Sequence, residues 1–374
     1  MTKLVPIIVF SIMMAWLSEN RSRHRLNEDG KLVYAYKDKF FYFLLAASMA
    51  VLVGLRTRGN DTYAYRQMYE NTGTGLDNIA GIDWSNIAAA PGLQCYCVIL
   101  KTLGATTQDY FMLTALITVG IYLWFIRKYT CDIFLSIFYF ITMGAYTFTM
   151  AAIKQTFAVA LLLLATDNAI QRKWFKYLFW VMLAELFHPY AFIYLVVPFA
   201  TFSPWSKGTL FLLAGSVFVA FFMSRFLGAI DSLTEALGYD YEANEFAGAG
   251  VNKFRVLVVW VPLALSFLRK EKLRRSNDRT MNIIINLMMV NAVIMFIGLF
   301  GTANYFARLA NYFLIFQTIA LPWILRIFTR EDRRALTAMS IVGFSAYCYY
   351  GEALANGSFD ANYNFISIWE YLRR

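Results

Sequence analysis

The chain has 374 residues, of which 59% are hydrophobic and 16% are charged, and its formal net charge is +10. A soluble domain is typically about 45–50% apolar and about 25% charged, so this composition excludes a soluble enzyme or binding module. In a membrane protein, basic residues mainly set orientation, so the positive charge does not indicate a nucleic-acid partner.

Apolar runs bounded by charged residues predict the helices. A helix needs roughly 20 residues to cross a hydrocarbon core about 30 Å thick. We therefore expect an all-α polytopic membrane protein, a single transmembrane domain over residues 1–374 with about 11–12 transmembrane segments. The expected helices lie at 4–18, 40–55, 109–126, 131–149, 155–170, 174–187, 189–202, 208–228, 254–268, 281–300, 304–325 and 335–350.

The basic residues also predict the orientation. Arg21, Arg23 and Arg25 follow the first run, and the positive-inside tendency then places segment 19–39 in the cytoplasm. Alternation along the chain puts 127–130 and 269–280 on that same side. The extracytoplasmic loops are then 56–108 and 229–253, in which we expect interfacial helices.

Residues 56–66 hold the densest group of polar side chains. Arg56 and Arg58 are two residues apart, so in an extended segment they point the same way. Gly59-Asn60 indicates a turn, and Asp61 is placed to cap a helix that begins at Thr62.

This segment suits a phosphorylated sugar. The planar guanidinium of arginine donates two parallel hydrogen bonds to phosphate, which makes Arg56, Arg58 and Arg66 candidate diphosphate ligands. Tyr63 and Tyr65 offer apolar rings and hydroxyl groups to a sugar. The alternative is an interfacial helix with snorkelling arginines and an Arg66–Glu70 ion pair.

Two further cations belong to the same predicted side of the membrane. Lys154 lies at the outer end of the 131–149/155–170 hairpin, and Arg308 lies within an apolar run that also contains Tyr305 and Tyr312. Charges in apolar segments are costly and mark functional sites by default. We therefore predict that Lys154 and Arg308 bind a diphosphate and that Tyr305 and Tyr312 bind sugar.

His188-Pro189 interrupts the pair 174–187 and 189–202. A residue before proline is disfavoured in the α region, and non-helical backbone at membrane depth must line a cavity or be buried in protein. The alternation of sides works only if the pair forms two crossings or a re-entrant pair. His188, near Glu185, is the side chain best suited to move a proton near neutral pH; the alternative is a histidine that only stabilises the kink.

The four elements just described resemble, in order, the motifs of the EpsG family of bacterial exopolysaccharide proteins, within the wider group of Wzy-like polysaccharide polymerases. The residues that carry the resemblance are Gly54-Leu55-Arg56 with Asp61-Thr62-Tyr63-Ala64-Tyr65-Arg66, Ile153-Lys154-Gln155 with Ala158, Leu183-Ala184 with Phe187-His188, and Arg308 to Tyr312.

Two departures from the family pattern affect the predicted site. Lys154 stands where the family usually has arginine, which keeps the charge but loses the bidentate fork. Ala90-Pro91-Gly92 stands where the family often has Glu-Pro-Gly, so one carboxylate is absent.

The resemblance implies a helical bundle like that of GT-C glycosyltransferases, in the bacterial cytoplasmic membrane, with its active site facing the extracytoplasmic side. It implies a polymerase that joins polyprenyl (undecaprenyl)-diphosphate-linked oligosaccharides, as donor and acceptor, without metal or cofactor. It also implies chain-length regulator and flippase proteins as partners, beside membrane lipid. His188 ranks above Asp61 as the catalytic group that takes the acceptor proton, because imidazole titrates near pH 6.5 and carboxylates near 4.

Two other functions remain open from the sequence. An O-antigen-ligase-like transferase would use the same donor and the same cations. A flippase or exporter of lipid-linked oligosaccharide would need a polar path through the membrane and no acid–base group.

Overall fold

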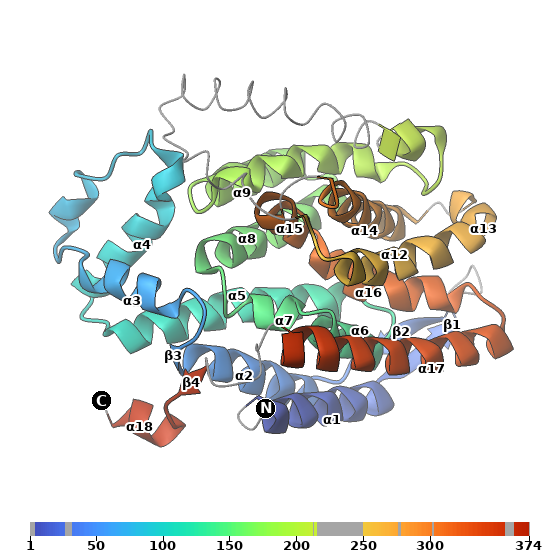
Figure 1. The fold of residues 1–374 in the computed structure, drawn as a ribbon, viewed down its shortest axis with the longest axis horizontal. Coiled ribbons are helices and arrows are strands. Elements are labelled where there is room, and N and C mark those ends of the chain that lie inside the picture. The colour runs from blue at the N-terminus through green and yellow to red at the C-terminus, as the bar shows by residue number, and fades with distance from the viewer. Residues whose placement is uncertain are drawn as a thin grey trace. The chain divides into compact units, whose positions relative to one another are not determined.

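The computed structural model describes residues 4–26, 32–211, 213–214, 250–275, 278–300, 303–355 and 363–373. These residues are helical almost throughout and contain only short strands (Figure 1), which confirms the predicted helical membrane protein. The chain divides into two compact units. Unit 1 comprises Met1–Ile82, Gln94–Ala160 and Met339–Arg374, and unit 2 comprises Asp83–Leu93 and Leu161–Ala338.

Unit 1 is built around helices that pack side by side in Figure 1, with α2 between α1 and α5. Its two small sheets are both antiparallel pairs, β1 with β2 and β3 with β4. Its elements are α1 (Val5–Arg21), β1 (Arg23–Leu26), β2 (Leu32–Tyr36), α2 (Phe40–Gly54), β3 (Arg56–Arg58), α3 (Thr62–Glu70), η1 (Leu76–Ile79), most of α4 (Pro91–Thr102), α5 (Thr107–Tyr129), α6 (Ile133–Thr142), α7 (Ala145–Phe148), the start of α8 (Ile153–Ile170), the end of α17 (Arg330–Tyr347), η5 (Cys348–Ala355), β4 (Asn364–Phe365) and α18 (Ile368–Leu372).

Helices α2 and α5 run antiparallel. The Tyr42 hydroxyl, near the start of α2, donates to the carbonyl of Leu123 near the end of α5, at 2.6 Å. The Gln108 amide, at the start of α5, donates to the carbonyl of Gly54 at the end of α2, at 2.7 Å. Unit 1 therefore has two opposite ends. We call them the hairpin end, with β1 and β2, and the motif end, with β3 and α3.

Unit 2 packs around α14, whose side chains are buried along nearly its whole length. Polar side chains in this core make interhelical hydrogen bonds, as expected for asparagines in a membrane bundle: Asn291 donates to the carbonyl of Ala310 at 2.7 Å, and Gln317 donates to Asn291 at 2.8 Å. The elements are η2 (Ile87–Ala89), the rest of α8, α9 (Trp174–Glu185), η3 (Pro189–Thr201), α12 (Lys253–Leu268), α13 (Lys270–Arg274), α14 (Arg279–Ile297), α15 (Ala303–Asn311), α16 (Leu314–Arg326) and the start of α17.

Three helices of the described part are long and apolar enough to cross a membrane: α5, α8 and α14. The pair α15 and α16 makes a fourth if it is a single broken span, and α2, α6 and η3 are shorter apolar helices. The predicted helix 208–228 and loop 229–253 lie largely outside the described residues.

Three predicted helices differ from the structure. The run 131–149 is interrupted between α6 and α7, where Gly144 adopts φ +81°, a conformation that glycine tolerates without a steric cost. The run 304–325 is two helices, α15 and α16, bent by 54°. The run 189–202 is a 3₁₀ helix rather than an α-helix. Periodicity alone does not show such breaks, because the apolar character continues through them.

Candidate functional site

Arg56 is buried at the motif end, with 1% of its surface exposed. One guanidinium nitrogen donates to the carbonyl of Val53 at 2.9 Å, and the group lies 4.9 Å from the centre of the Phe111 ring. Its Nε makes no hydrogen bond to any described residue. Burial lowers the pKa of Arg56 to about 10, although the Asp61 carboxylate opposes the shift. The group is therefore charged at neutral pH and has a donor to spare.

Arg58 has a different environment from Arg56. It is exposed, and the β3–β4 pairing is irregular between the two arginines. The prediction that they point the same way assumed a regular strand, and the irregular pairing removes that assumption. The structure therefore gives the two arginines separate surroundings.

The turn predicted at Gly59-Asn60 is present. Gly59 adopts φ +126° and Asn60 φ +41°, and the Asn60 amide donates to the Tyr363 hydroxyl at 2.5 Å. Helix α3 begins at Thr62, as expected. Asp61 occupies the N-cap position, but its side chain makes no capping hydrogen bond, so the predicted cap is wrong. Its carboxylate instead acts on the charge of Arg56.

Tyr65 connects two motifs that are far apart in the sequence. Its hydroxyl oxygen accepts a hydrogen bond from the backbone N–H of Lys154 at 3.2 Å. Lys154 lies half-buried in the first turn of α8, where the helix dipole favours an anion. Tyr63, by contrast, is 66% exposed and accepts a hydrogen bond from Gln67 at 2.7 Å.

Arg66 lies beside the same aromatic ring as Arg56. Its guanidinium is 6.0 Å from the centre of the Phe111 ring and 3.9 Å from the Glu70 carboxylate. The Arg66–Glu70 pair of the alternative interpretation is therefore present. A surface pair of this kind is worth little, so it leaves Arg66 available to a stronger anion. We call Arg56, Asp61, Tyr65, Arg66 and Lys154 the motif-end cluster.

The chain breaks at His188-Pro189 in unit 2, as the sequence predicts. Helix α9 ends at Glu185, and His188 is extended, with φ −158° and ψ +125°. The Glu185 carboxylate is buried and accepts the backbone N–H of Phe192 at 3.0 Å. It thus supplies a hydrogen-bond acceptor for one backbone N–H group near the helix break.

His188 is held by a tyrosine that is distant in the sequence and lies between α15 and α16. Its Nδ1 lies 2.7 Å from the hydroxyl of Tyr312, and the backbone N–H of Tyr190 donates to the same nitrogen at 3.5 Å. The rings of Tyr190 and Tyr305 meet edge to face at 5.3 Å. Arg308 lies three residues after Tyr305 on α15, so the two side chains share one face of that helix.

We call His188, Tyr190, Tyr305, Arg308 and Tyr312 the break cluster. Tyr312 has no exposed surface and Tyr305 has 7%. A fully buried ring offers no face to a sugar, so the position of Tyr312 favours a role in holding His188.

Residues 39–366 match the model of the EpsG family. The chain belongs to the EpsG family. That family is linked to exopolysaccharide biosynthesis. All four motifs quoted from the sequence fall within the matched range. No curated protein and no solved structure matches the chain.

The EpsG chain also contains site residues whose structural role sequence reasoning did not predict. Gly92 donates its N–H to the carbonyl of Leu186 at 2.8 Å, directly at the end of α9. Ala90 is buried with φ +56°, so the Ala90-Pro91-Gly92 segment stabilises the break. Pro91 is the first residue of α4, a helix position that proline favours, and this preference was the available signal. Nothing in the sequence marks Phe111, Tyr190 or Tyr363 as a site residue, because the chain contains many aromatic residues.

Proposed function

We propose that this EpsG family protein is a polysaccharide polymerase. It joins polyprenyl-diphosphate-linked oligosaccharide repeat units at the outer face of the cytoplasmic membrane. The hydroxyl of one lipid-linked unit attacks the anomeric carbon of the growing chain. The bond from that carbon to the diphosphate oxygen breaks, and the polyprenyl diphosphate leaves with the bonding electron pair.

The hydrogen bond between Tyr65 and Lys154 carries this proposal. It brings together two motifs 89 residues apart and places a helix N-terminus, a lysine and a tyrosine at one point of unit 1. Arg56 and Arg66 share the nearby Phe111 ring. Several cations and oriented N–H groups around one point suit the multiple negative charges of a diphosphate. No metal ion is needed to offset those charges.

The break cluster suggests a specific role for His188. A backbone N–H only donates, so the contact from Tyr190 makes Nδ1 an acceptor. Tyr312 then donates to Nδ1 as well, and the proton of the neutral ring resides on Nε2. We therefore assign His188 to donate a hydrogen bond from Nε2 to an oxygen of the lipid-linked substrate. Asp61 is the candidate acceptor for the hydroxyl proton, which reverses the ranking that solution pKa values suggest.

The decisive experiment uses purified protein in lipid nanodiscs with polyprenyl-diphosphate-linked repeat units. A ladder of products that differ by whole repeat units, each still on its lipid carrier, supports the polymerase. Transfer of the oligosaccharide only to lipid A or to a protein acceptor would identify a ligase instead. Movement of unchanged substrate across a vesicle membrane, with no new glycosidic bond, would identify a flippase.

A further inference from the structure

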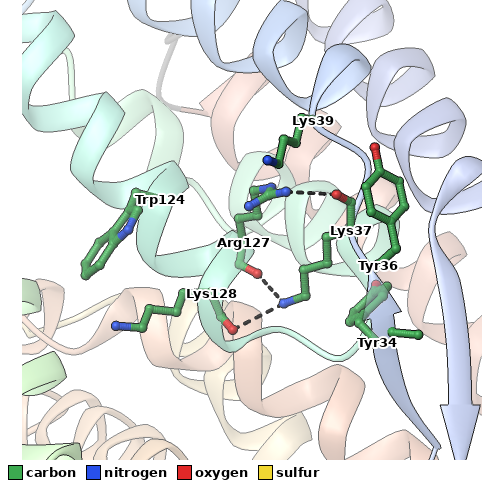
Figure 2. Close-up of a pocket in the computed structure, with 8 residues that line it drawn as sticks. Tyr34, Tyr36, Lys37, Lys39, Trp124, Arg127 and Lys128 are labelled. Carbon is green, nitrogen blue, oxygen red and sulfur yellow. Dashed lines mark hydrogen bonds between the residues drawn. The ribbon is translucent and has the colours of Figure 1, made fainter.

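A cavity at the hairpin end of unit 1 lies apart from both clusters described above (Figure 2). Its volume is about 450 Å³. The lining contains four cationic side chains, three aromatic side chains and no acidic one, namely Lys37, Lys39, Arg127, Lys128, Tyr34, Tyr36 and Trp124, together with Ala35. We call it the hairpin-end pocket.

Two of the four cations hold the walls of the pocket together. The Lys37 ammonium donates to the carbonyls of Arg127, of Lys128 at 3.2 Å and of Thr130 at 3.3 Å, and so satisfies the C-terminal carbonyls of α5. In return, the Arg127 guanidinium donates to the carbonyl of Lys37 at 2.9 Å. Figure 2 shows these reciprocal bonds. They join segments 19–39 and 127–130, which the charge pattern places on the same side of the membrane.

The other two cations, Lys39 and Lys128, are exposed. The Lys128 ammonium lies 4.9 Å from the centre of the Trp124 ring, and Trp124 is itself 39% exposed. The nearby acidic side chain of Asp38 is buried and accepts the backbone N–H of Phe41 at 2.8 Å, so it does not line the pocket. The exposed ammonium groups therefore give the pocket a net positive charge.

The position of the pocket along α5 indicates at which membrane surface it lies. Arg127 and Lys128 lie in the last turn of α5, whereas the motif end contacts its first turn. A helix of 23 residues spans about 35 Å at roughly 1.5 Å per residue. That length matches a hydrocarbon core of about 30 Å, so α5 as a membrane span puts the pocket and the motif-end cluster at opposite membrane surfaces.

We propose that the hairpin-end pocket binds the phosphate group of an anionic phospholipid in the membrane leaflet opposite the motif-end cluster. Lys39 and Lys128 bind the phosphate, and the exposed rings of Tyr36 and Trp124 lie at the level of the headgroups, where aromatic side chains are enriched. Basic pockets at the ends of membrane helices recognise lipid headgroups in this way. The site is independent of the proposed polymerase activity.

The test measures lipid retention by the purified full-length protein. Native mass spectrometry after exchange into mixed micelles compares phosphatidylglycerol with phosphatidylcholine. We expect the wild type to retain phosphatidylglycerol preferentially. The Lys39→Ala/Lys128→Ala variant should bind it more weakly, roughly fivefold per lysine and about 25-fold in total. Lys37 and Arg127 are left unchanged because they hold the fold.

The matched control is Arg23→Ala/Arg25→Ala, which removes two exposed charges from the same hairpin outside the pocket lining. It should keep the wild-type preference. Equal weakening in both double variants, or none in either, would overturn the pocket assignment. Thermal stabilisation of the wild type by inorganic phosphate alone, without a preference for phosphatidylglycerol, would replace the lipid by a soluble phosphate ligand.

Discussion

The hydroxyl of Tyr312 lies 2.7 Å from Nδ1 of His188, although 124 residues separate them in the sequence. Tyr312 is itself fixed, because its carbonyl accepts the Tyr194 hydroxyl at 3.0 Å. The Tyr312 hydroxyl and the Tyr190 N–H both contact Nδ1, and together they orient the imidazole ring. The proposed donor role of His188 depends on this orientation.

Removal of the Tyr312 hydroxyl tests this relation. Tyr312→Phe keeps the buried ring but removes one hydrogen bond, worth about 1 kcal/mol. We expect turnover to fall about five- to tenfold with little change in folding, measured as product-ladder formation. Tyr349→Phe, at an exposed tyrosine of η5, is the matched control and should stay near wild type. Equal turnover in the two variants would contradict a role of the Tyr312 hydroxyl in positioning His188.

The role of His188 is tested by two substitutions at the same position. His188→Gln keeps a side-chain N–H donor, whereas His188→Ala does not. If His188 donates from Nε2, glutamine should retain at least about tenfold more turnover than alanine, and the pH–rate profile of His188→Gln should keep the shape of the wild-type profile. Turnover in His188→Gln as low as in His188→Ala, with the acidic limb absent from the residual activity, would instead restore His188 as the general base.

Substitutions of the motif-end cations should lower turnover by different amounts, according to the burial and position of each side chain. Lys154→Ala removes a charge-assisted interaction worth roughly 1.5–3 kcal/mol, so we expect turnover to fall by about one to two decades. Lys154→Arg should be tolerated, because it keeps the charge. Arg58→Ala is the control, since Arg58 is exposed and separate from Arg56. A larger loss for Arg58→Ala than for Lys154→Ala would move the diphosphate site away from the start of α8.

The turn before α3 should require glycine. A Cβ at Gly59 would lie 2.4 Å from the ring of Tyr363, and φ is +126°. Gly59→Ala should therefore cost about 1–3 kcal/mol of local strain and lower the midpoint of thermal unfolding. Gly120→Ala in α5, where nothing lies within 4 Å of the added atom, should not lower the midpoint and should raise it slightly, because alanine favours the helix over glycine. An unchanged midpoint in Gly59→Ala would show that the turn relaxes.

The orientation in the membrane is tested by single cysteines in a chain whose four cysteines (Cys95, Cys97, Cys131 and Cys348) are replaced by alanine. Asp77, Arg25 and Arg275 are exposed and lie in segments predicted to be outside, inside and inside. An impermeant thiol reagent should label Asp77→Cys in intact cells, and it should label Arg25→Cys and Arg275→Cys only after the cells are opened. The reverse pattern would invert the topology and place the motif-end cluster at the inner surface.

The sequence by itself predicted the helical membrane class, the family, the turn before α3 and the break at His188-Pro189. The thickness of the bilayer sets the length of the apolar runs, so run length and an apolar composition are enough to predict the class. The turn at Gly59-Asn60 and the extended His188 are backbone effects of glycine and of the residue before proline. These are local causes, and the structure contains both features where the sequence placed them.

Only the tertiary structure decided which side chains meet. The Tyr65–Lys154 and His188–Tyr312 contacts depend on how distant helices pack, and no periodicity encodes the partner of a given tyrosine. The irregular pairing of β3 with β4 likewise gave Arg56 and Arg58 different surroundings. Local rules fix the backbone of a segment, whereas burial and hydrogen-bond partners are set by whatever packs against it.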